Sequence, residues 1–200
     1  MKYNRPWENY DEYVDAQTNT NKRKLERVWI SEREIDSIVE WIKNSDMEVE
    51  SGVCHGVRNG FEVERFRNLL EADIIGTEIS ETASRFANVL QWDFHDIKEG
   101  WVGKFDFIYS NSIDHSYDFR YCLNQWMRTL KKGGACFIEW SYGCTDAYFA
   151  LNSADCLSIE KEELENLLNE RNRVIDSFKV LDKNGMPNRT IFVVQHKENI

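Results

Sequence analysis

The feature that most constrains the fold is a regular alternation of strand-like and helix-like segments along the chain. Alternation of this kind predicts a parallel sheet with helices on both faces, because each parallel connection needs a crossover. The last two strand-like runs, 174–181 and 189–195, flank an Asn-Gly turn signal in the short segment 182–188 and are therefore predicted to be antiparallel neighbours. The five strands before them are predicted over 47–50, 73–78, 88–91, 105–109 and 134–140.

The predicted helices and an N-terminal segment complete the organisation of the chain. Ser31 is followed three residues later by Glu34, a capping-box pattern, and apolar residues then recur at helical spacing over roughly 32–44. Further helices are predicted over 61–71, 81–86 and 119–130, and after a cap at Ser158. The 200 residues are expected to form one α/β domain over 31–200, preceded by an arm or lid over 1–30.

Composition narrows the function classes. Lys and Arg number 25 against 35 Asp and Glu, and the net charge of -10 disfavours binding to nucleic acids and anionic membranes. Five cysteines without a CxxC spacing argue against a zinc finger or a disulfide framework. No apolar run is long enough to span a membrane and the N-terminus lacks a secretory pattern, so a cytoplasmic location is expected. Trp29, Trp41 and Trp126 have apolar neighbours and are predicted core residues.

Polar residues at the ends of three predicted strands form a candidate ligand site. The first strand leads into a loop over 51–60 whose glycines let a ligand approach bare backbone. Glu78 ends the second strand and can accept hydrogen bonds from both hydroxyls of a ribose. Asp93 follows the third strand between Trp92 and Phe94, which suits a base whose rim donates to the carboxylate. Because the carboxyl ends of parallel strands share one edge, these residues together predict an adenosine site.

In this order the segments resemble the class I S-adenosylmethionine-dependent methyltransferases over about residues 47–196, including the terminal antiparallel hairpin. The resemblance extends to 130–135, which looks like that family's corner between a helix and the fifth strand, and to 105–112 as its fourth strand. It implies an α/β, Rossmann-like methyltransferase fold with a mainly parallel seven-stranded sheet, a C-terminal antiparallel hairpin and helices on both faces. It also implies S-adenosylmethionine as the cofactor and S-adenosylhomocysteine as the product.

The same resemblance implies which residues hold the cofactor. They are Glu50, Gly52, Cys54, Gly56, Glu78, Ile79, Trp92, Asp93, Phe94, Ser110 and Asn111. Gly52, Cys54 and Gly56 are expected near the methionine part, Glu78 on the ribose and Asp93 on the adenine. Cys54 departs from the family pattern, because it stands where the middle of three alternating glycines is usual.

The methyl acceptor is expected beyond the fourth and fifth strands, because transfer needs an acceptor aligned with the activated methyl group. His115 is the predicted general base, oriented by Asp114, since the ordinary pKa of a histidine lies near neutrality. The alternative is that Asp114 caps the following helix and His115 is a solvated loop residue. The residues predicted to contact the substrate are His55, Glu139, Trp140 and Tyr142.

The class of acceptor follows from exclusions. The fourth strand ends in residues 111–114, Asn-Ser-Ile-Asp, where methyltransferases of exocyclic base nitrogens resemble Asn-Pro-Pro-Tyr, and the chain has no Pro-Cys nucleophile. DNA is therefore not expected, and a small-molecule or saccharide oxygen or nitrogen is the predicted acceptor. No metal site is predicted, because His55, His95 and His115 show no ligand spacing.

Two other function classes stay open at this stage, as does the oligomeric state. One is a catalytically inactive binding or scaffold module that kept the methyltransferase fold, for which Cys54 is the main argument. The other is a nucleotide-dependent oxidoreductase, which also uses a glycine loop and a terminal acid but whose GxGxxG fingerprint is absent.

Overall fold

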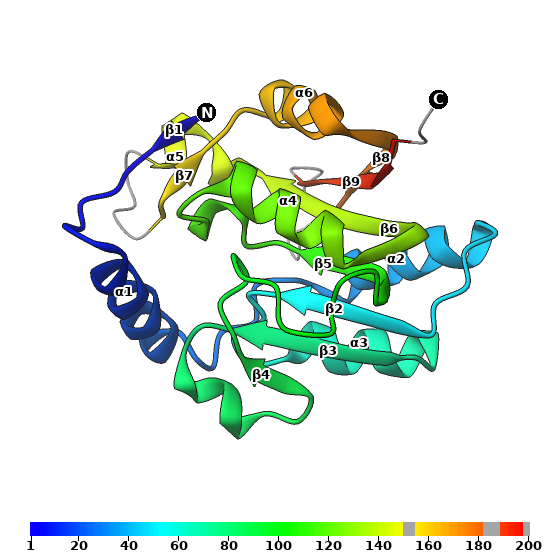
Figure 1. The fold of residues 1–200 in the computed structure, drawn as a ribbon, viewed down its shortest axis with the longest axis horizontal. Coiled ribbons are helices and arrows are strands. Elements are labelled where there is room, and N and C mark those ends of the chain that lie inside the picture. The colour runs from blue at the N-terminus through cyan, green and yellow to red at the C-terminus, as the bar shows by residue number, and fades with distance from the viewer. Residues whose placement is uncertain (150–154, 182–188, 198–200) are drawn as a thin grey trace.

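The main sheet has the predicted arrangement (Figure 1). The computed structural model describes residues 1–149, 155–181 and 189–197. Its main strands are β2 (Ser51–His55), β3 (Asp73–Glu78), β4 (Val89–Gln91), β5 (Phe105–Ser110), β6 (Leu130–Ser141), β8 (Asn172–Val180) and β9 (Arg189–His196). They form a seven-stranded sheet in the order β4-β3-β2-β5-β6-β9-β8. The strands from β4 to β6 are parallel, and β9 is antiparallel to both of its neighbours, which confirms the predicted fold class.

Helices cover both faces of this sheet, and each face buries its own core. The helices are α2 (Glu32–Asn44), α3 (Phe61–Leu70), α4 (Phe119–Thr129) and α6 (Lys161–Arg171), with shorter segments η1 (Glu81–Arg85), η2 (Ile113–His115), η3 (Tyr142–Cys144) and α5 (Asp146–Phe149). Apolar residues of α2 and α3 pack with Phe107 and Phe137 on one face. Those of α4 and α6 pack with Ile108 and Ile138 on the other. Successive side chains of β5 and β6 therefore enter opposite cores, as the pleat of a strand requires.

The parallel strands bring five chain positions to one edge of the sheet. Their carboxyl ends are His55, Glu78, Gln91, Ser110 and Ser141. In open parallel sheets this edge is where loops and helix N-termini form ligand sites. The N-terminal segment lies against this edge in Figure 1.

Within that segment the chain is more regular than the sequence indicates. A short strand β1 (Lys2–Tyr3) pairs with β7 (Leu157–Ser158), and α1 (Tyr10–Arg23) follows. The side chain of Asn9 caps α1 by accepting a hydrogen bond from the backbone of Glu12. Among the described residues, no helix is both long and apolar enough to cross a membrane.

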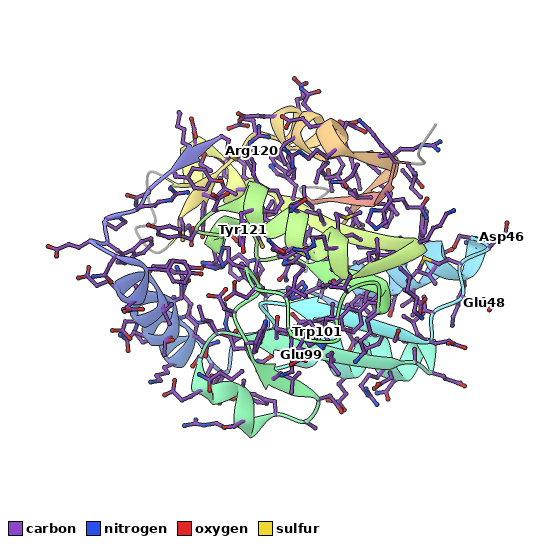
Figure 2. The ribbon with its side chains drawn as sticks, viewed as in Figure 1. Asp46, Glu48, Glu99, Trp101, Arg120 and Tyr121 are labelled. Atoms are coloured by element: carbon purple, nitrogen blue, oxygen red, sulfur yellow. The ribbon has the colours of Figure 1, made fainter. Side chains whose placement is uncertain are left out.

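The predicted position of the first strand is wrong by four residues. Residues 46–50 connect α2 to β2, and Asp46 and Glu48, labelled in Figure 2, are exposed there. The alternation in 47–50 is typical of a strand with one exposed face. The strand that forms, β2, instead lies in the centre of the sheet between β3 and β5, and such strands are recognised by small or apolar residues without alternation.

Two further element boundaries differ from the predictions, those at the start of α6 and at the start of β6. Ser158 belongs to β7, and the residue that precedes α6 as its N-cap is Glu160. Strand β6 starts at Leu130 rather than at 134, because the chain pairs with β5 directly after α4. The predicted turn over 182–188 lies outside the described residues.

Candidate active site

Two adjoining cavities lie at the carboxyl edge of the sheet. The smaller cavity, of about 60 Å³, is bounded by α1 and by the segments after β3 and β4. The larger cavity, of about 240 Å³, lies between the segments after β5 and β6 and residues 24–30. Both cavities are lined by Gly56, Arg58, Ser112 and His115. They therefore form two halves of one cleft that meet at the turn after β2 and the segment after β5.

The turn after β2 spans residues 56–60 and requires unusual backbone angles. Gly56 has φ of +75°, and a Cβ added there would lie 2.7 Å from the Cβ and Oγ atoms of Ser112. Gly60 has φ of +73° and precedes α3. Between them, Arg58 adopts φ of +49°, in the left-handed region that favours glycine. The turn thus brings bare backbone to the cleft at Gly56.

Three of the predicted cofactor residues lie elsewhere, and their assignment to the cofactor site is corrected. Glu50 precedes β2 and is exposed at the end of the strand opposite the cleft. Gly52 lies inside β2, where a Cβ would be 2.6 Å from Cδ1 of Phe107, so its small size serves packing. Cys54 is fully buried in β2, and burial raises the pKa of its thiol. Glycines stand at 52, 56 and 60, four residues apart. A glycine pattern assigned to residues 52–56 therefore fits residues 56–60 as well.

Glu78 ends β3 and presents a buried carboxylate to the smaller cavity. Its Oε1 accepts a hydrogen bond from the backbone of Ser80 at 3.1 Å, and its Oε2 accepts one from the backbone of Arg58 at 3.0 Å. Burial raises the pKa of Glu78, against the opposing effect of these two amides. Each oxygen keeps further acceptor capacity. Ile79, the next residue, also lines this cavity.

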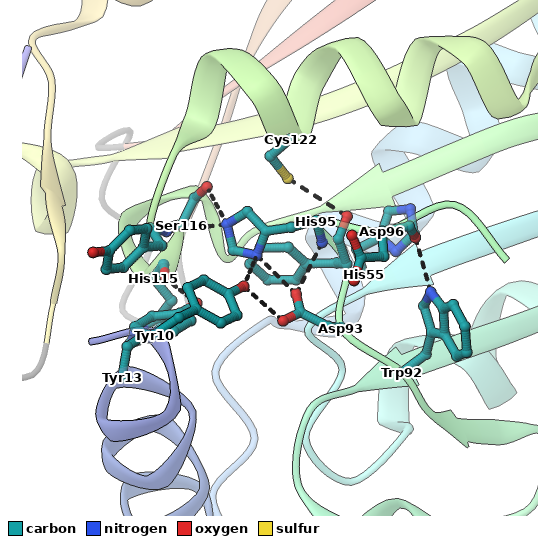
Figure 3. Close-up of polar contacts among 12 residues, drawn as sticks. Tyr10, Tyr13, His55, Trp92, Asp93, His95, Asp96, His115, Ser116 and Cys122 are labelled. Atoms are coloured by element: carbon teal, nitrogen blue, oxygen red, sulfur yellow. Dashed lines mark hydrogen bonds and ion pairs between the residues drawn. The ribbon is translucent and has the colours of Figure 1, made fainter.

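Asp93 is held in a network that joins the loop after β4 to α1 (Figure 3). The Tyr10 hydroxyl donates to Asp93 Oδ2 at 2.6 Å, and the backbone of His95 donates to Asp93 Oδ1 at 2.9 Å. His95 Nδ1 also lies 2.7 Å from that oxygen. Burial acts to raise the pKa of Asp93, but His95 and Tyr10 outweigh it and the pKa falls below its ordinary value.

The two aromatic neighbours of Asp93 differ in their placement. Phe94 lines the smaller cavity. Trp92 lines neither cavity, and its Nε1 donates to the backbone oxygen of Asp96 at 2.8 Å. The predicted contact of Trp92 with the adenine is therefore corrected: the side chain packs near Trp101. Proximity to Asp93 in the sequence does not fix the direction in which a loop side chain points.

The segment after β5 separates the two cavities. Asn111 lines the larger cavity, and Ser112 lines both. Ser110 is buried beneath them, and its hydroxyl donates to the backbone oxygen of His55 at 3.1 Å, so its predicted contact with the cofactor is corrected. The predicted base and its partner, His115 and Asp114, both line the larger cavity.

The side chains predicted to bind substrate lie outside both cavities. His55 is buried, with Nδ1 2.8 Å from Oγ1 of Thr77, and burial lowers its pKa to about 3. Glu139 is buried and bonded to Arg189 at 2.7 Å. The predictions for these two are wrong, because the side chains point into the protein. The Nε1 atom of Trp140 donates to Ile159, and Tyr142 is exposed.

Residues that the sequence did not single out complete the cleft. Tyr13 and Asn21 of α1 line the smaller cavity, and Asp155 lines the larger one. Trp29 also lines the larger cavity and is 49% exposed, so its predicted core position is wrong. Arg58 could have been found from the glycines on either side of it. The other residues belong to segments that are remote in sequence and come together only in the folded protein.

The chain is similar to known methyltransferases in part of its sequence and in its fold. Residues 53–138 match a family model described as a methyltransferase domain. The N-methyltransferase NodS from Bradyrhizobium japonicum WM9, solved with S-adenosyl-L-homocysteine, is 14% identical, with a TM-score of 0.68 over 92% of this chain and 100% of that chain. No curated protein sequence matches the chain.

Two more solved structures show the same architecture. The 1,6-didemethyltoxoflavin-N1-methyltransferase of Burkholderia thailandensis is 12% identical, with a TM-score of 0.73 over 99% of this chain and 95% of that chain. A methyltransferase of Thermotoga maritima, described as a possible histamine N-methyltransferase, is 18% identical, with a TM-score of 0.61 over 93% and 99% of the respective chains. The chain therefore shares the fold of these methyltransferases, and the first two structures hold S-adenosylhomocysteine, the product of the cofactor S-adenosylmethionine.

The cleft fits that cofactor in two respects. The carboxylate of Glu78 offers two adjacent oxygens at the end of β3, as a ribose diol requires. Gly56 lines both cavities without a side chain, so a ligand in the cleft can meet the backbone of the turn. The middle position of the turn is Arg58 instead of glycine, and its Nη1 donates to the backbone oxygen of Arg27 at 3.1 Å.

Proposed function

We propose that the chain transfers a methyl group from S-adenosylmethionine to an oxygen or nitrogen of a small molecule or saccharide. The observation that carries this proposal is the division of the cleft into two cavities that share the turn at 56–60 and the segment at 112–115. A methyltransferase needs this arrangement, because donor and acceptor must be held end to end for in-line transfer.

The residues of the smaller cavity suit the nucleoside part of the cofactor. In this proposal Glu78 accepts hydrogen bonds from the ribose hydroxyls, and Asp93 accepts one from the adenine amino group. Ile79 and Phe94 supply apolar contacts to the base. Gly56 faces the methionine part from the turn after β2. When bound, the cofactor supplies a methyl group already activated by a sulfonium sulfur.

The residues of the larger cavity suit the acceptor. His115 is proposed to remove or hold the acceptor proton, with Asp114 beside it. The backbone oxygen of His115 is fixed by two contacts, because the Tyr13 hydroxyl donates to it at 2.9 Å and the Cys156 thiol lies 3.2 Å away. A base held in this way keeps its distance to the acceptor.

The inactive-module alternative loses its main support. Its argument was that Cys54 would crowd the cofactor, yet Cys54 lies within β2 and lines neither cavity. The net charge of -10 supports a small acceptor over DNA.

The proposal is tested by incubating the protein with S-adenosylmethionine and pools of small metabolites, then measuring S-adenosylhomocysteine and methylated products by mass spectrometry. We expect S-adenosylhomocysteine to form only with some pools, and His115→Ala to slow its formation by about 100-fold. His196→Ala, an exposed histidine on β9, is the matched control. Equal rates in the two variants would reject the role of His115, and cofactor binding without turnover on any pool would favour the inactive module.

A further inference from the structure

Three ionisable side chains meet at one end of the larger cavity. Asp114 and His115 come from η2, and Asp155 precedes β7. One ligand atom from each of these residues lies within 4.8 Å of the other two. The segment that carries Asp155 is joined to η2, because the backbone of Cys156 donates to the backbone oxygen of Asp114 at 2.8 Å. The three side chains, called the acidic cluster below, are therefore held on one rigid frame.

Two polar atoms of the acidic cluster lack hydrogen-bond partners within the described part of the chain. Asp114 Oδ1 and His115 Nδ1 are buried and make no hydrogen bond with any described residue. The side chain of Asp155 is 7% exposed, and its Oδ1 lies 3.8 Å from His115 Nδ1, too far for a hydrogen bond. Buried polar groups in native proteins are normally satisfied. Two such atoms beside the buried carboxylate of Asp155, all at one cavity, indicate a ligand that would satisfy them together.

The charge of the acidic cluster indicates the sign of that ligand. Among the described residues, no Lys or Arg nitrogen forms an ion pair with Asp114 or Asp155. Burial raises the pKa of Asp155 to about 6, and the charge of Asp114 adds to this rise. The positive charges of His115 and Lys24 lower the pKa of Asp155, but by less than burial and Asp114 raise it. Two carboxylates that face each other in a partly dry cavity are stabilised by a cation placed between them.

We propose that the acidic cluster binds the ammonium group of the methyl acceptor, so that the acceptor is a small organic amine. This inference rests on the proposed function, since it names the acceptor class of the same cleft. An ammonium nitrogen makes hydrogen bonds of about 2.8 Å in tetrahedral directions, which places its acceptors about 4.6 Å apart. Neighbouring ligands of a small divalent ion, at about 2.1 Å from the metal, lie about 3 Å apart. The separation of 3.8 Å between His115 Nδ1 and Asp155 Oδ1 lies midway between these two values, so the choice between an amine and a metal rests on the rest of the cavity.

Part of the remaining wall of the cavity is apolar and suits the carbon skeleton of such a molecule. Trp29 and Val28 are exposed apolar residues that line it, and Tyr148 lines it from α5. An organic amine can pack its carbon skeleton against these side chains while its nitrogen reaches the acidic cluster. A free metal ion would make no use of this apolar wall.

The acidic cluster also contains a group that can accept the proton that the ammonium loses. The ammonium must lose one proton before its nitrogen has a lone pair, and His115 Nδ1 is placed to accept it. The nitrogen then forms a bond to the methyl carbon while the sulfur–carbon bond breaks, and that electron pair remains on sulfur as the thioether. The methylated amine is again cationic, and Asp114 and Asp155 neutralise it. His115 returns its proton to solvent.

The test compares amines with alcohols of the same shape in calorimetric titrations of the protein loaded with S-adenosylhomocysteine. The probes are benzylamine against benzyl alcohol and propylamine against 1-propanol, with Mg²⁺, Mn²⁺ and Zn²⁺ titrated separately. The variants are Asp114→Asn and Asp155→Asn, with the exposed Asp46→Asn as the matched control. S-adenosylhomocysteine is titrated first into every variant.

We expect at least one amine to bind about tenfold or more tightly than its alcohol, and both cluster variants to lose about tenfold in amine affinity, with Asp46→Asn unchanged. S-adenosylhomocysteine affinity should be the same in all proteins, and the melting temperature of Asp155→Asn at pH 8 should be no lower than that of the parent. Equal binding of amines and alcohols, or amine binding retained in both variants, would overturn the inference alone. Micromolar binding of a divalent ion lost in both variants would replace the amine by a metal. Absence of S-adenosylhomocysteine binding to the parent would instead reject the proposed function and this inference with it.

Discussion

Glu62 provides a prediction whose size can be worked out from the structure. The residue lies in the first turn of α3, is 5% exposed and lines the larger cavity. Burial raises the pKa of Glu62 from 4.5 to about 8, although its own backbone amide and Arg58 act in the opposite direction. The folded protein therefore holds this carboxyl in its protonated form at neutral pH.

The sign of the stability effect follows from proton binding. Above pH 4.5 the unfolded chain releases the Glu62 proton while the folded chain keeps it, so this group lowers the free energy of unfolding as the pH rises toward 8. At about 1.4 kcal/mol per pH unit, the loss reaches roughly 3 kcal/mol at pH 7. A glutamine at this position has no ionisation to lose. We expect Glu62→Gln to gain up to roughly 3 kcal/mol over the parent protein between pH 4 and pH 7.

The assay is urea denaturation of both proteins at pH 4, 5, 6, 7 and 8, with the difference in unfolding free energy plotted against pH. Glu64→Gln, on the exposed side of the same helix, removes the same formal charge and is the control. Its difference from the parent should be nearly flat over this range. A flat difference for Glu62→Gln would refute the reasoning, because it would mean that Glu62 ionises in the folded protein as readily as in the unfolded chain.

Three other variants test separate parts of the account. Gly52→Ala should destabilise the protein by about 1–3 kcal/mol in urea denaturation, because its Cβ would lie 2.6 Å from Phe107; a loss of S-adenosylhomocysteine affinity without loss of stability would return this residue to the cofactor site. Gly56→Ala should weaken S-adenosylhomocysteine about tenfold or more by calorimetry, since φ is +75° and Ser112 is 2.7 Å away; unchanged affinity would show that the turn does not contact the ligand. Tyr10→Phe removes a hydroxyl that joins α1 to the loop after β4 and should cost about 1 kcal/mol in unfolding free energy. An unchanged melting temperature in that variant would mean that the bond contributes nothing to the docking of α1.

Much of the fold could be predicted from local pattern. The helix over 32–44 and the strand over 73–78 form with the predicted bounds, because capping signals and periodicity are properties of neighbouring residues. The antiparallel pairing of β8 with β9 follows from the shortness of their connection. The placement of β2 failed, because a central strand carries no alternation and its glycines repeat with the spacing of the turn that follows.

Some residues of the candidate site could be predicted from the sequence, and others could not. Glu78 and Asp93 were found because a parallel sheet collects strand ends at one edge, whatever the rest of the chain does. Glu139 also ends near that edge, but its side chain turns into the protein toward Arg189, and sequence pattern does not determine that direction. Tyr13 and Asp155 reach the cleft from segments that fold back onto it, which only the tertiary structure reveals.

The central claim is that the cleft at the ends of β2, β3 and β5 binds S-adenosylmethionine. The most direct test is calorimetric titration of S-adenosylhomocysteine into the parent protein, Glu78→Gln and the exposed control Glu48→Gln. The account predicts micromolar binding to the parent and the control, and binding weaker by about tenfold or more in Glu78→Gln, where one acceptor oxygen is lost. Absence of binding to the parent, or equal binding in all three proteins, would contradict it.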